Sequence, residues 1–447
     1  MKGQFAIVFG FVLAIVYIVS SGDRRSSGGA NNSKSPSRGG WSVSQLSNLS
    51  EFRQPDPSIS IATVWGRKIS LAKRDSLCVF GPTQSFKTSR LAIPAIVQFR
   101  EGSAVISSVK SDLFEATHLN RERYGLVYVF DPFGTSSHGN CQFDPIALSG
   151  DPLSRRRIAT LITSNMAVSG GTSESKFWAT LAARLLESLL HAAFVGGRSL
   201  VELMTWVEEG SFEQPRQLLK SEGEQISLAR LLAIFSEDEK IVSSTVTTLE
   251  AYLEPFHMMR FSNDGEAVNL ATLDPSVESM TIYLIAPPTR QVEAGQLFAT
   301  LLSTIFDKIY ANQGSTRTLF VFDEAANLAP VANLDEVVST IASFGGQVIS
   351  IYQDFAQLSH RYHDSAMSIV NNHRAKLFLG GISDPLTINL ASQISGVNRQ
   401  VKSNRIKADR DRGDKLLANG ELRSLSPGYG LLIYGHRPAL IVRMLAK

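Results

Sequence analysis

Short, continuously apolar segments recur along this chain, and stretches with helical periodicity separate most of them. Segments of this kind, without polar–apolar alternation, are typical of strands that are buried on both faces of a parallel sheet. The seven clearest are residues 76–80, 104–109, 126–130, 281–285, 318–322, 347–352 and 376–379. Because helices separate most of these strands, the sequence predicts an α/β fold with a doubly wound, mostly parallel sheet.

The strand pattern is interrupted between about residues 145 and 269. Helical periodicity dominates this interval, in the segments 177–194, 200–209 and 228–256. Helices that lie between two sets of strands predict an insertion into a sheet domain. We therefore expect a sheet domain made of residues 59–145 and 270–447, with an all-α domain of residues 146–269 inserted into it.

The composition excludes several classes of protein. Hydrophobic residues make up 43% of the 447 residues and charged residues 19%, an ordinary globular balance. This balance excludes a disordered chain, a collagen-like chain and a protein that spans the membrane many times. The two cysteines, Cys78 and Cys141, exclude a disulfide framework and a four-cysteine zinc site.

An apolar run extends from Phe5 to Val19 near the start of the chain. As a helix it spans roughly 22 Å, against about 30 Å for the hydrocarbon core of a bilayer. With its neighbouring residues it predicts a membrane anchor of marginal length over residues 1–22. A cleaved secretory signal peptide has an apolar run of similar length. The flank lacks a clean A-x-A cleavage site, which favours the anchor.

The residues after this run predict a flexible linker over residues 23–58, because Ser26–Gly40 contains five serines and four glycines. Basic residues after the run outnumber Lys2 before it; they are Arg24, Arg25, Lys34 and Arg38. Positive charge stays on the cytoplasmic side of a membrane segment. We therefore expect a single-pass protein of the cytoplasmic (inner) membrane, with the bulk of the chain in the cytoplasm.

A phosphate-binding motif follows the first apolar segment. The strand runs into GPTQSFKTS and then into a helical stretch, which is the strand–loop–helix context of a P-loop. In such a loop Lys87 would reach the β- and γ-phosphates, and the Thr88 hydroxyl would ligate Mg²⁺. The predicted loop consists of Gly81, Pro82, Thr83, Gln84, Ser85, Phe86, Lys87, Thr88 and Ser89. An ordinary Gly-Pro turn before a helix is the alternative.

Phe86 departs from the P-loop pattern G-x-x-x-x-G-K-[ST], which has glycine at this position. Glycine lets the main chain approach the phosphates without a Cβ and tolerates unusual backbone angles. The sequence is consistent with a phenyl ring that points away from the nucleotide, and equally with one that distorts the loop and weakens binding.

The apolar segment 318–322 ends in two adjacent carboxylates, as a Walker B site requires. Asp323 would hold the Mg²⁺ shell, and Glu324 would orient and deprotonate the attacking water. Many buried strands end in surface acids, which is the plain alternative. Together with the Lys87 loop, however, these carboxylates predict an ATPase that uses ATP and Mg²⁺.

Two further polar residues accompany later strands. Gln353 follows the segment 347–352. If strands that are consecutive in the sequence are neighbours in the sheet, Gln353 lies beside Asp323. It would then either sense the γ-phosphate or its water, or simply cap the strand. Arg374 precedes the segment 376–379. It would act as an arginine finger in a neighbouring subunit's site, or form a surface ion pair.

Contact with DNA is less evident than contact with a nucleotide. The chain has 44 Lys and Arg against 41 Asp and Glu, a net charge of +3, so nucleic-acid binding must be local. The densest basic run is residues 399–415. It lacks aromatic residues for base stacking. Phosphate contact by Lys402, Arg405 and Lys407 is one interpretation, and a solvated loop is the other.

Five segments follow one another in an order that resembles a known family. They are SLCVFGPTQSFKTSRLAIPAIV, VISSVKSDLFEATHLNRERYGLVYVFDPFG, FWATLAARLLESLLHAA, FVFDEAANLAPVANLDEVVSTIASFGGQVISIYQDFAQL and IVNNHRAKLFLGGISDPLTINLASQISG. This order is similar to that of the type IV secretion coupling proteins, the TraG/TraD-type conjugative DNA-transfer ATPases, especially those of Gram-positive actinobacteria. The Lys-Ser-Asp, Asp-Glu-x-Ala-Asn-Leu and Gly-Gly-x-Ser-Asp-Pro signatures carry the resemblance, which covers about residues 59 to 447.

The resemblance implies a RecA-like P-loop NTPase domain, an inserted all-α domain that faces the cytosol, and a membrane-anchored homo-hexamer. The family couples ATP hydrolysis to the movement of single-stranded DNA, with its attached relaxase, towards a secretion channel. The matching residues are Gly81, Ser85, Lys87 and Thr88 for Walker A, Asp323 and Glu324 for Walker B, Gln353 for the glutamine motif, and Arg374 near the inter-subunit arginine. Phe86 and the single membrane segment depart from the family pattern.

Two other functions are consistent with the residues. An FtsK-like translocase of double-stranded DNA would carry a DNA-reading domain at its C-terminus, whereas this chain stops soon after its last apolar segments, 430–434 and 439–444. A docking subunit that does not hydrolyse ATP would keep the altered P-loop for a structural role alone.

Overall fold

The computed structural model describes residues 52–54, 56–166, 173–260, 267–312, 316–395 and 421–446. The predicted membrane anchor, most of the predicted linker and the basic run 399–415 lie outside these residues. Within the described ranges, no helix combines the length and the apolar character needed to cross a membrane. The membrane anchor and the DNA-contacting run therefore stay predictions.

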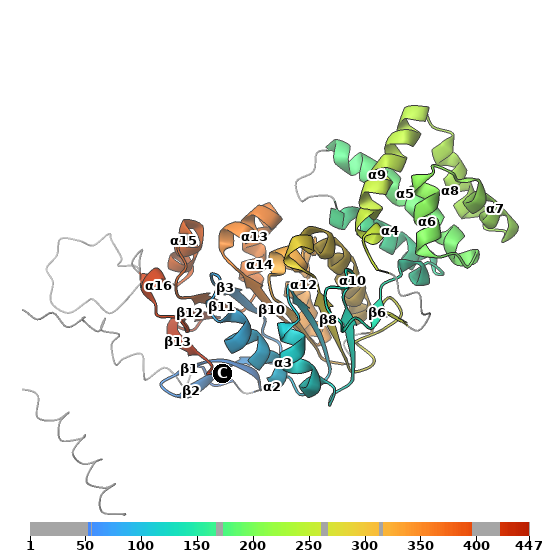
Figure 1. Cartoon of the computed structure of the whole chain (residues 1–447). Coiled ribbons are helices and arrows are strands. Elements are labelled where there is room, and N and C mark those ends of the chain that lie inside the picture. The colour runs from blue at the N-terminus through green and yellow to red at the C-terminus, as the bar shows by residue number, and fades with distance from the viewer. Residues whose placement is uncertain are drawn as a thin grey trace, which may run out of the picture. The chain divides into compact units, whose positions relative to one another are not determined.

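One large mixed sheet forms the framework of the protein (Figure 1). Its eleven strands lie in the order β2-β1-β13-β12-β11-β3-β10-β9-β4-β8-β5. The strands are β1 (Pro57–Val64), β2 (Arg67–Ala72), β3 (Leu77–Phe80), β4 (Ser103–Ser108), β5 (Leu126–Phe130), β8 (Met280–Ile285), β9 (Thr318–Phe322), β10 (Gly346–Tyr352), β11 (Ala375–Leu379), β12 (Tyr429–Tyr434) and β13 (Leu440–Met444).

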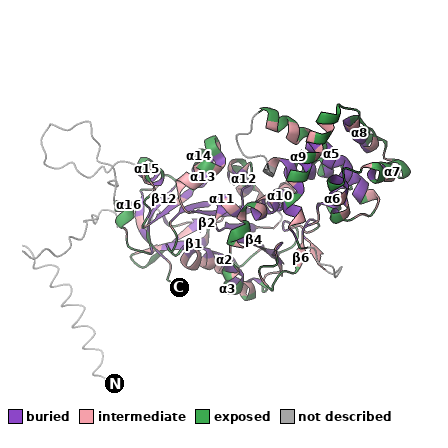
Figure 2. Ribbon diagram, turned by 45° about the horizontal axis from the view of Figure 1, so that its top comes forward, coloured by how far each residue is buried: buried purple, intermediate pink, exposed green. Residues whose placement is uncertain are grey.

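The seven predicted strands form the parallel part of this sheet, from β11 to β5. Every residue of β3, β4, β8, β9 and β10 is buried, as expected for strands with helices on both faces. The prediction of an α/β fold with a mostly parallel sheet is confirmed. In Figure 2 the strands are largely coloured as buried, and exposed residues lie on the helices around them.

Four antiparallel strands extend the sheet at one side, β12, β13, β1 and β2. The sequence predicts β12 and β13 but not the hairpin of β1 and β2. Both hairpin strands mix buried residues with exposed and half-buried ones, so neither carries a continuous apolar run. Strand β1 also begins at Pro57, inside the predicted linker.

Helices flank the sheet on both sides in the two views of the molecule. Helices α2 and α3 lie on one side, and α10, α12, α13 and α14 lie on the other (Figures 1 and 2). The helices are α2 (Ile93–Gln98), α3 (Asp112–Arg121), α10 (Gln291–Ala311), α11 (Ala325–Leu328), α12 (Leu334–Thr340), α13 (Phe355–Tyr362), α14 (Ala366–Asn372), α15 (Pro385–Ile394) and α16 (Glu421–Ser424). This arrangement is a doubly wound sheet.

Six helices occupy the interval that the sequence marks as helical (Figure 1). They are α4 (Pro152–Met166), α5 (Ser173–Val195), α6 (Leu200–Glu208), α7 (Glu213–Ser221), α8 (Gln225–Phe235) and α9 (Glu239–His257). The short strands β6 (Cys141–Gln142) and β7 (Val268–Asn269) pair just before and after them. The predicted continuous helix 228–256 is two helices, because the Asp238 side chain accepts a hydrogen bond from the Lys240 amide and starts α9.

Candidate functional site

Three neighbouring strands bring the predicted site residues to one edge of the sheet. Strand β3 ends at the predicted phosphate loop, β9 ends at Asp323, and β10 lies between them and is followed by Gln353. All three run parallel, so their carboxyl ends meet at the same edge. Strands β9 and β10, which are consecutive in this part of the sequence, are neighbours as the position of Gln353 requires.

The loop after β3 folds back on its own first residue. The Gly81 amide donates to the carbonyl of Tyr352 on β10 at 3.1 Å, and the Lys87 ammonium donates to the Gly81 carbonyl at 2.7 Å. A Cβ on Gly81 would lie 2.8 Å from Leu379 Cδ1, so a larger residue here would have to displace the Leu379 side chain. Lys87 is buried, and its charge is held inside the loop.

The helix that follows the loop begins with a π-helical turn, Thr88–Ala92, which continues into α2. The Thr88 hydroxyl donates to Asp323 Oδ2 at 3.0 Å. The hydroxyl oxygen of Ser85 is buried, and it has no hydrogen-bond partner among the described residues. A water, an ion or a ligand that binds at the loop would give this buried oxygen a hydrogen-bond partner.

Asp323 is a buried carboxylate beneath this loop. Burial raises its pKa to about 6, while the hydrogen bond from Thr88 opposes the rise. A buried acid with a raised pKa gains stability when a cation supplies the missing charge. Hydroxyl and carboxylate oxygens are the ligands that Mg²⁺ prefers, so the pair of Thr88 and Asp323 fits a magnesium ion.

Glu324 is held in place from two sides. Its Oε1 lies 3.9 Å from the Lys87 ammonium, and Gln353 Nε2 donates to both carboxylate oxygens at 3.2 and 3.3 Å. The backbone of Glu324 has a φ of +57°, in the left-handed region that residues other than glycine rarely adopt. Strained residues of this kind are concentrated at functional sites.

Phe86 also adopts a left-handed backbone, with a φ of +67°. The residue is 38% exposed, and the Arg90 guanidinium carbon lies 4.1 Å from the ring centroid. The glycine of the P-loop pattern takes up such a conformation at little cost, whereas a phenylalanine does so only under strain.

Arg374 is the predicted site residue that the structure does not bring to this edge. It directly precedes β11, whose first residue, Ala375, pairs with Leu77 at the start of β3. Its Nε lies 3.6 Å from a carboxylate oxygen of Asp75. Arg374 therefore lies at the opposite edge of the sheet from the loop of its own chain, and its action in a neighbouring subunit stays a prediction.

The sequence assigns no role to two residues that belong to this region. Asp112 is a nearby acid that helps to raise the pKa of Asp323, and it receives hydrogen bonds from the Ser108 hydroxyl and the Leu113 amide. Arg90 covers the ring of Phe86. Asp112 belongs to the Lys-Ser-Asp signature, which could have identified it from the sequence. Arg90 belongs to none of the motifs found in the sequence.

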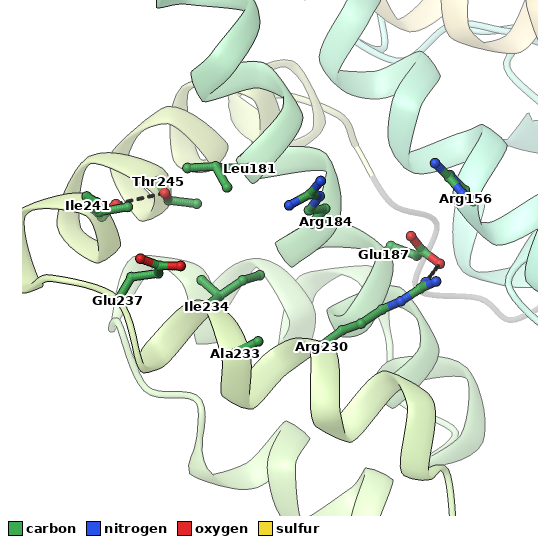
Figure 3. A pocket seen from close by; sticks show the side chains of 10 residues that line it. All are labelled: Arg156, Leu181, Arg184, Glu187, Arg230, Ala233, Ile234, Glu237, Ile241 and Thr245. Carbon is green, nitrogen blue, oxygen red and sulfur yellow. Dashed lines mark hydrogen bonds and ion pairs between the residues drawn. The ribbon is translucent and has the colours of Figure 1, made fainter.

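A separate cavity of about 360 Å³ lies among the helices of the inserted interval (Figure 3). Its lining residues are Arg156, Leu181, Arg184, Glu187, Arg230, Ala233, Ile234, Glu237, Ile241 and Thr245. Arg230 forms an ion pair with Glu187, and the lining carries charges of both signs. Side chains of mixed charge do not select one class of ligand, so the edge of the sheet remains the candidate site.

Solved structures with a similar fold include the conjugative coupling protein TrwB. The unbound coupling protein TrwBΔN70 matches with a TM-score of 0.68 and 19% identity over 91% of this chain and 92% of that chain. TrwB in complex with ADP and Mg²⁺ matches with the same score and identity over 91% and 93%. VirB4 of Thermoanaerobacter pseudethanolicus matches less well, with a TM-score of 0.55, 13% identity, and coverage of 89% and 98%. The chain therefore shares the α/β fold of TrwB.

Sequence relatives point to the same class. VirD4 of Rhizobium radiobacter is 22% identical over 89% of this chain and 61% of the relative, and VirD4 of Agrobacterium fabrum is 22% identical over 84% and 59%. The chain thus spans about three-fifths of the length of these relatives. The family model described as "Type IV secretory system Conjugative DNA transfer" matches residues 40–411. The chain belongs to this family, and the predicted resemblance to type IV secretion coupling proteins is confirmed.

Proposed function

We propose that this chain is a membrane-anchored ATPase of a conjugative type IV secretion system. It couples single-stranded DNA and the attached relaxase to the secretion channel, and ATP hydrolysis drives the transfer. Membership of the conjugative DNA transfer family supports this proposal. TrwB, which shares the fold, has been solved with ADP and Mg²⁺ and with a non-hydrolysable ATP analogue.

The observation that carries the proposal is the convergence of five side chains from three strand ends. They are Lys87, Thr88, Asp323, Glu324 and Gln353. Two hydrogen bonds and an ion pair, between residues that are adjacent in the chain at 87–88 and 323–324, join them into one cluster. A buried ammonium, two adjacent acids and a hydroxyl at the start of a helix suit a triphosphate with its magnesium ion. An ordinary turn before a helix requires none of these contacts.

In this proposal residues of the loop and of the end of β9 bind different parts of the magnesium–nucleotide ligand. Lys87 and the backbone amides of the loop hold the phosphates, and Thr88 and Asp323 hold the cation. The bound Mg²⁺ supplies positive charge that neutralises the developing charge on the γ-phosphate. The unpartnered Ser85 hydroxyl gives the loop one more donor for a phosphate oxygen.

Glu324 is the residue that we assign to proton transfer. It orients the attacking water and accepts its proton, a role worth about 10²- to 10⁴-fold in rate. Gln353 fixes the carboxylate through its two hydrogen bonds, and Lys87 keeps positive charge close to it. Arg374 would complete the site of a neighbouring subunit in a homo-hexamer.

A second candidate function rests on Phe86. Its positive φ places strain at the position where the P-loop pattern has glycine. This strain favours a subunit that binds nucleotide and docks the DNA–relaxase substrate without rapid turnover. The two candidates share the binding site and differ in the chemical step.

ATP hydrolysis by the full chain, with and without DNA, separates the candidates. We expect single-stranded DNA to stimulate turnover in the wild type but not in Lys87→Ala. Stimulation by double-stranded DNA alone would favour the FtsK-like translocase. Turnover that is absent with either DNA, together with ATP binding that Lys87→Ala abolishes, would favour the docking subunit.

A further inference from the structure

We infer that the ring of Phe86 forms a stacking subsite for the base of the nucleotide whose phosphates the loop binds. The inference rests on the proposed nucleotide site and adds the recognition of a purine base. It gives a role to the residue that departs from the P-loop pattern.

The first reason is that the adjacent residues Phe86 and Lys87 differ in their exposure to solvent. Lys87 is buried and turned towards the Gly81 carbonyl and Glu324, whereas the neighbouring residue Phe86 is 38% exposed. An aromatic ring is thus exposed at the edge of the loop that surrounds the phosphates. In a nucleotide the base is joined to the phosphates through a single sugar, so it must lie close to that loop.

The second reason is the way in which Arg90 holds the ring. The Arg90 guanidinium carbon lies 4.1 Å from the ring centroid, and the Arg90 amide donates to the Phe86 carbonyl at 3.0 Å. A cation at this distance covers one face of the ring. The rest of the ring stays exposed and available to a second planar group.

Gly428 lies next to the guanidinium of Arg90. Its φ is +84°, and a Cβ at Gly428 would lie 2.6 Å from Arg90 Nη1. The absence of a side chain there leaves room for the guanidinium. The Arg90 guanidinium therefore lies near both the ring and the backbone that leads into β12.

The third reason is the strain in the backbone at Phe86. A left-handed residue other than glycine persists only where its surroundings hold it, and such residues are concentrated at binding sites. Glycine would remove the strain, and a buried ring would gain stability from packing. Phe86 keeps the strain and is 38% exposed, so a ligand that stacks on the ring adds contacts that the folded chain alone does not supply.

The ligand class follows from the chemistry of stacking. A phenyl ring presents only its π-face, so it favours large planar bases and does not distinguish their hydrogen-bonding edges. We therefore expect ATP and GTP to bind with similar affinity. Inorganic tripolyphosphate has the phosphates without the base, and it should bind more weakly.

The test compares Mg²⁺–ATP with Mg²⁺–tripolyphosphate as ligands of the full-length chain. Phe86→Leu keeps a Cβ and the backbone strain but removes the π-face. We expect it to weaken ATP binding five- to tenfold and to change tripolyphosphate binding less than twofold. Phe86→Tyr should keep the wild-type ratio of the two dissociation constants. Phe177→Leu, which alters an exposed ring on α5, is the matched control.

Two outcomes would overturn the inference while leaving the phosphate site intact. An equal loss for both ligands would mean that the ring acts only through the shape of the loop. No change for either ligand would mean that the ring has no part in binding. Failure of the wild type to bind either ligand would instead overturn the proposed nucleotide site.

Discussion

The Thr88 hydroxyl donates a 3.0 Å hydrogen bond to a carboxylate oxygen of Asp323, although 235 positions separate the two residues in the sequence. This contact joins the loop after β3 to the end of β9. Because the two strands flank β10, both residues lie at the same edge of the sheet. In the proposed site this pair would supply two oxygen ligands for a divalent cation, and Lys87, the residue before Thr88, is buried.

Glu324→Gln tests the assignment of the proton acceptor. We expect turnover to fall by at least about a hundredfold, because an amide cannot accept the proton of the attacking water. ATP binding should persist, since the phosphate loop is unchanged. Steady-state hydrolysis measures the loss of turnover, and equilibrium binding measures whether ATP still binds. Glu250→Gln, on the exposed face of α9, is the control, and an equally large loss there would contradict the assignment.

Gln353→Ala tests whether turnover requires the hydrogen bonds that orient the Glu324 carboxylate. The substitution removes both hydrogen bonds from Gln353 Nε2 to the Glu324 carboxylate. Hydrogen bonds to a charged group are worth about 1.5–3 kcal/mol, so we expect turnover to fall roughly tenfold or more. The dissociation constant for ATP should change little. A variant that loses binding and keeps its rate would show that Gln353 serves the phosphates instead.

Phe86→Gly tests the effect of backbone strain on the chemical step. Glycine accepts a positive φ without cost and frees the loop to close on the phosphates. We expect turnover at saturating ATP to rise severalfold, while KM increases because the ring is lost. Phe86→Ala removes the ring and keeps the Cβ. It should raise KM without raising turnover, and an equal gain in rate with alanine would exclude strain as the cause.

His373 gives a pH-dependent prediction for stability. Burial lowers the pKa of its imidazole to about 4, against an ordinary value of 6.5. Its Nδ1 donates to the Ile369 carbonyl at 2.7 Å, and its Nε2 accepts from the Ser350 hydroxyl at 3.1 Å in the neutral form. Between pH 6.5 and 4 the unfolded chain therefore binds a proton that the folded chain does not. Stability contributed by the neutral ring is lost as the pH falls through this window.

We expect this histidine to reduce the free energy of unfolding by about 2 kcal/mol between pH 8 and pH 5. Denaturant titrations at the two pH values measure the difference. His373→Gln lacks the titrating group and should show a smaller loss, while the exposed His436→Gln should behave like the wild type. A His373→Gln variant with the full wild-type loss would contradict the prediction.

Much of the sheet could be predicted because its central strands are buried on both faces. Strands such as β9 and β10 contain only buried residues, so a continuous apolar run marks them without knowledge of their neighbours. The hairpin of β1 and β2 has no such signal, because exposed residues interrupt it. Half-buried strands at the side of a sheet depend on pairing that only the folded chain reveals.

The candidate site was predictable to the extent that it depends on strand ends. Lys87, Asp323 and Gln353 each follow an apolar strand, and parallel strands bring such residues together. Arg90 depends on side-chain packing after folding, so its sequence position carries little information, whereas Asp112 lies in the Lys-Ser-Asp signature. The position of Arg374 relative to a neighbouring subunit depends on assembly, which one chain does not define.

A double-mutant cycle on nucleotide affinity most directly tests whether the loop and β9 hold one ligand. The dissociation constant of Mg²⁺–ATP is measured for the wild type, Lys87→Ala, Asp323→Asn and the double variant. If both side chains bind the same magnesium–triphosphate unit, each single variant should weaken binding strongly. The double variant should then lose much less than the sum of the two single losses, because the two sites are coupled. Strictly additive losses, or affinity that neither variant changes, would contradict a shared site.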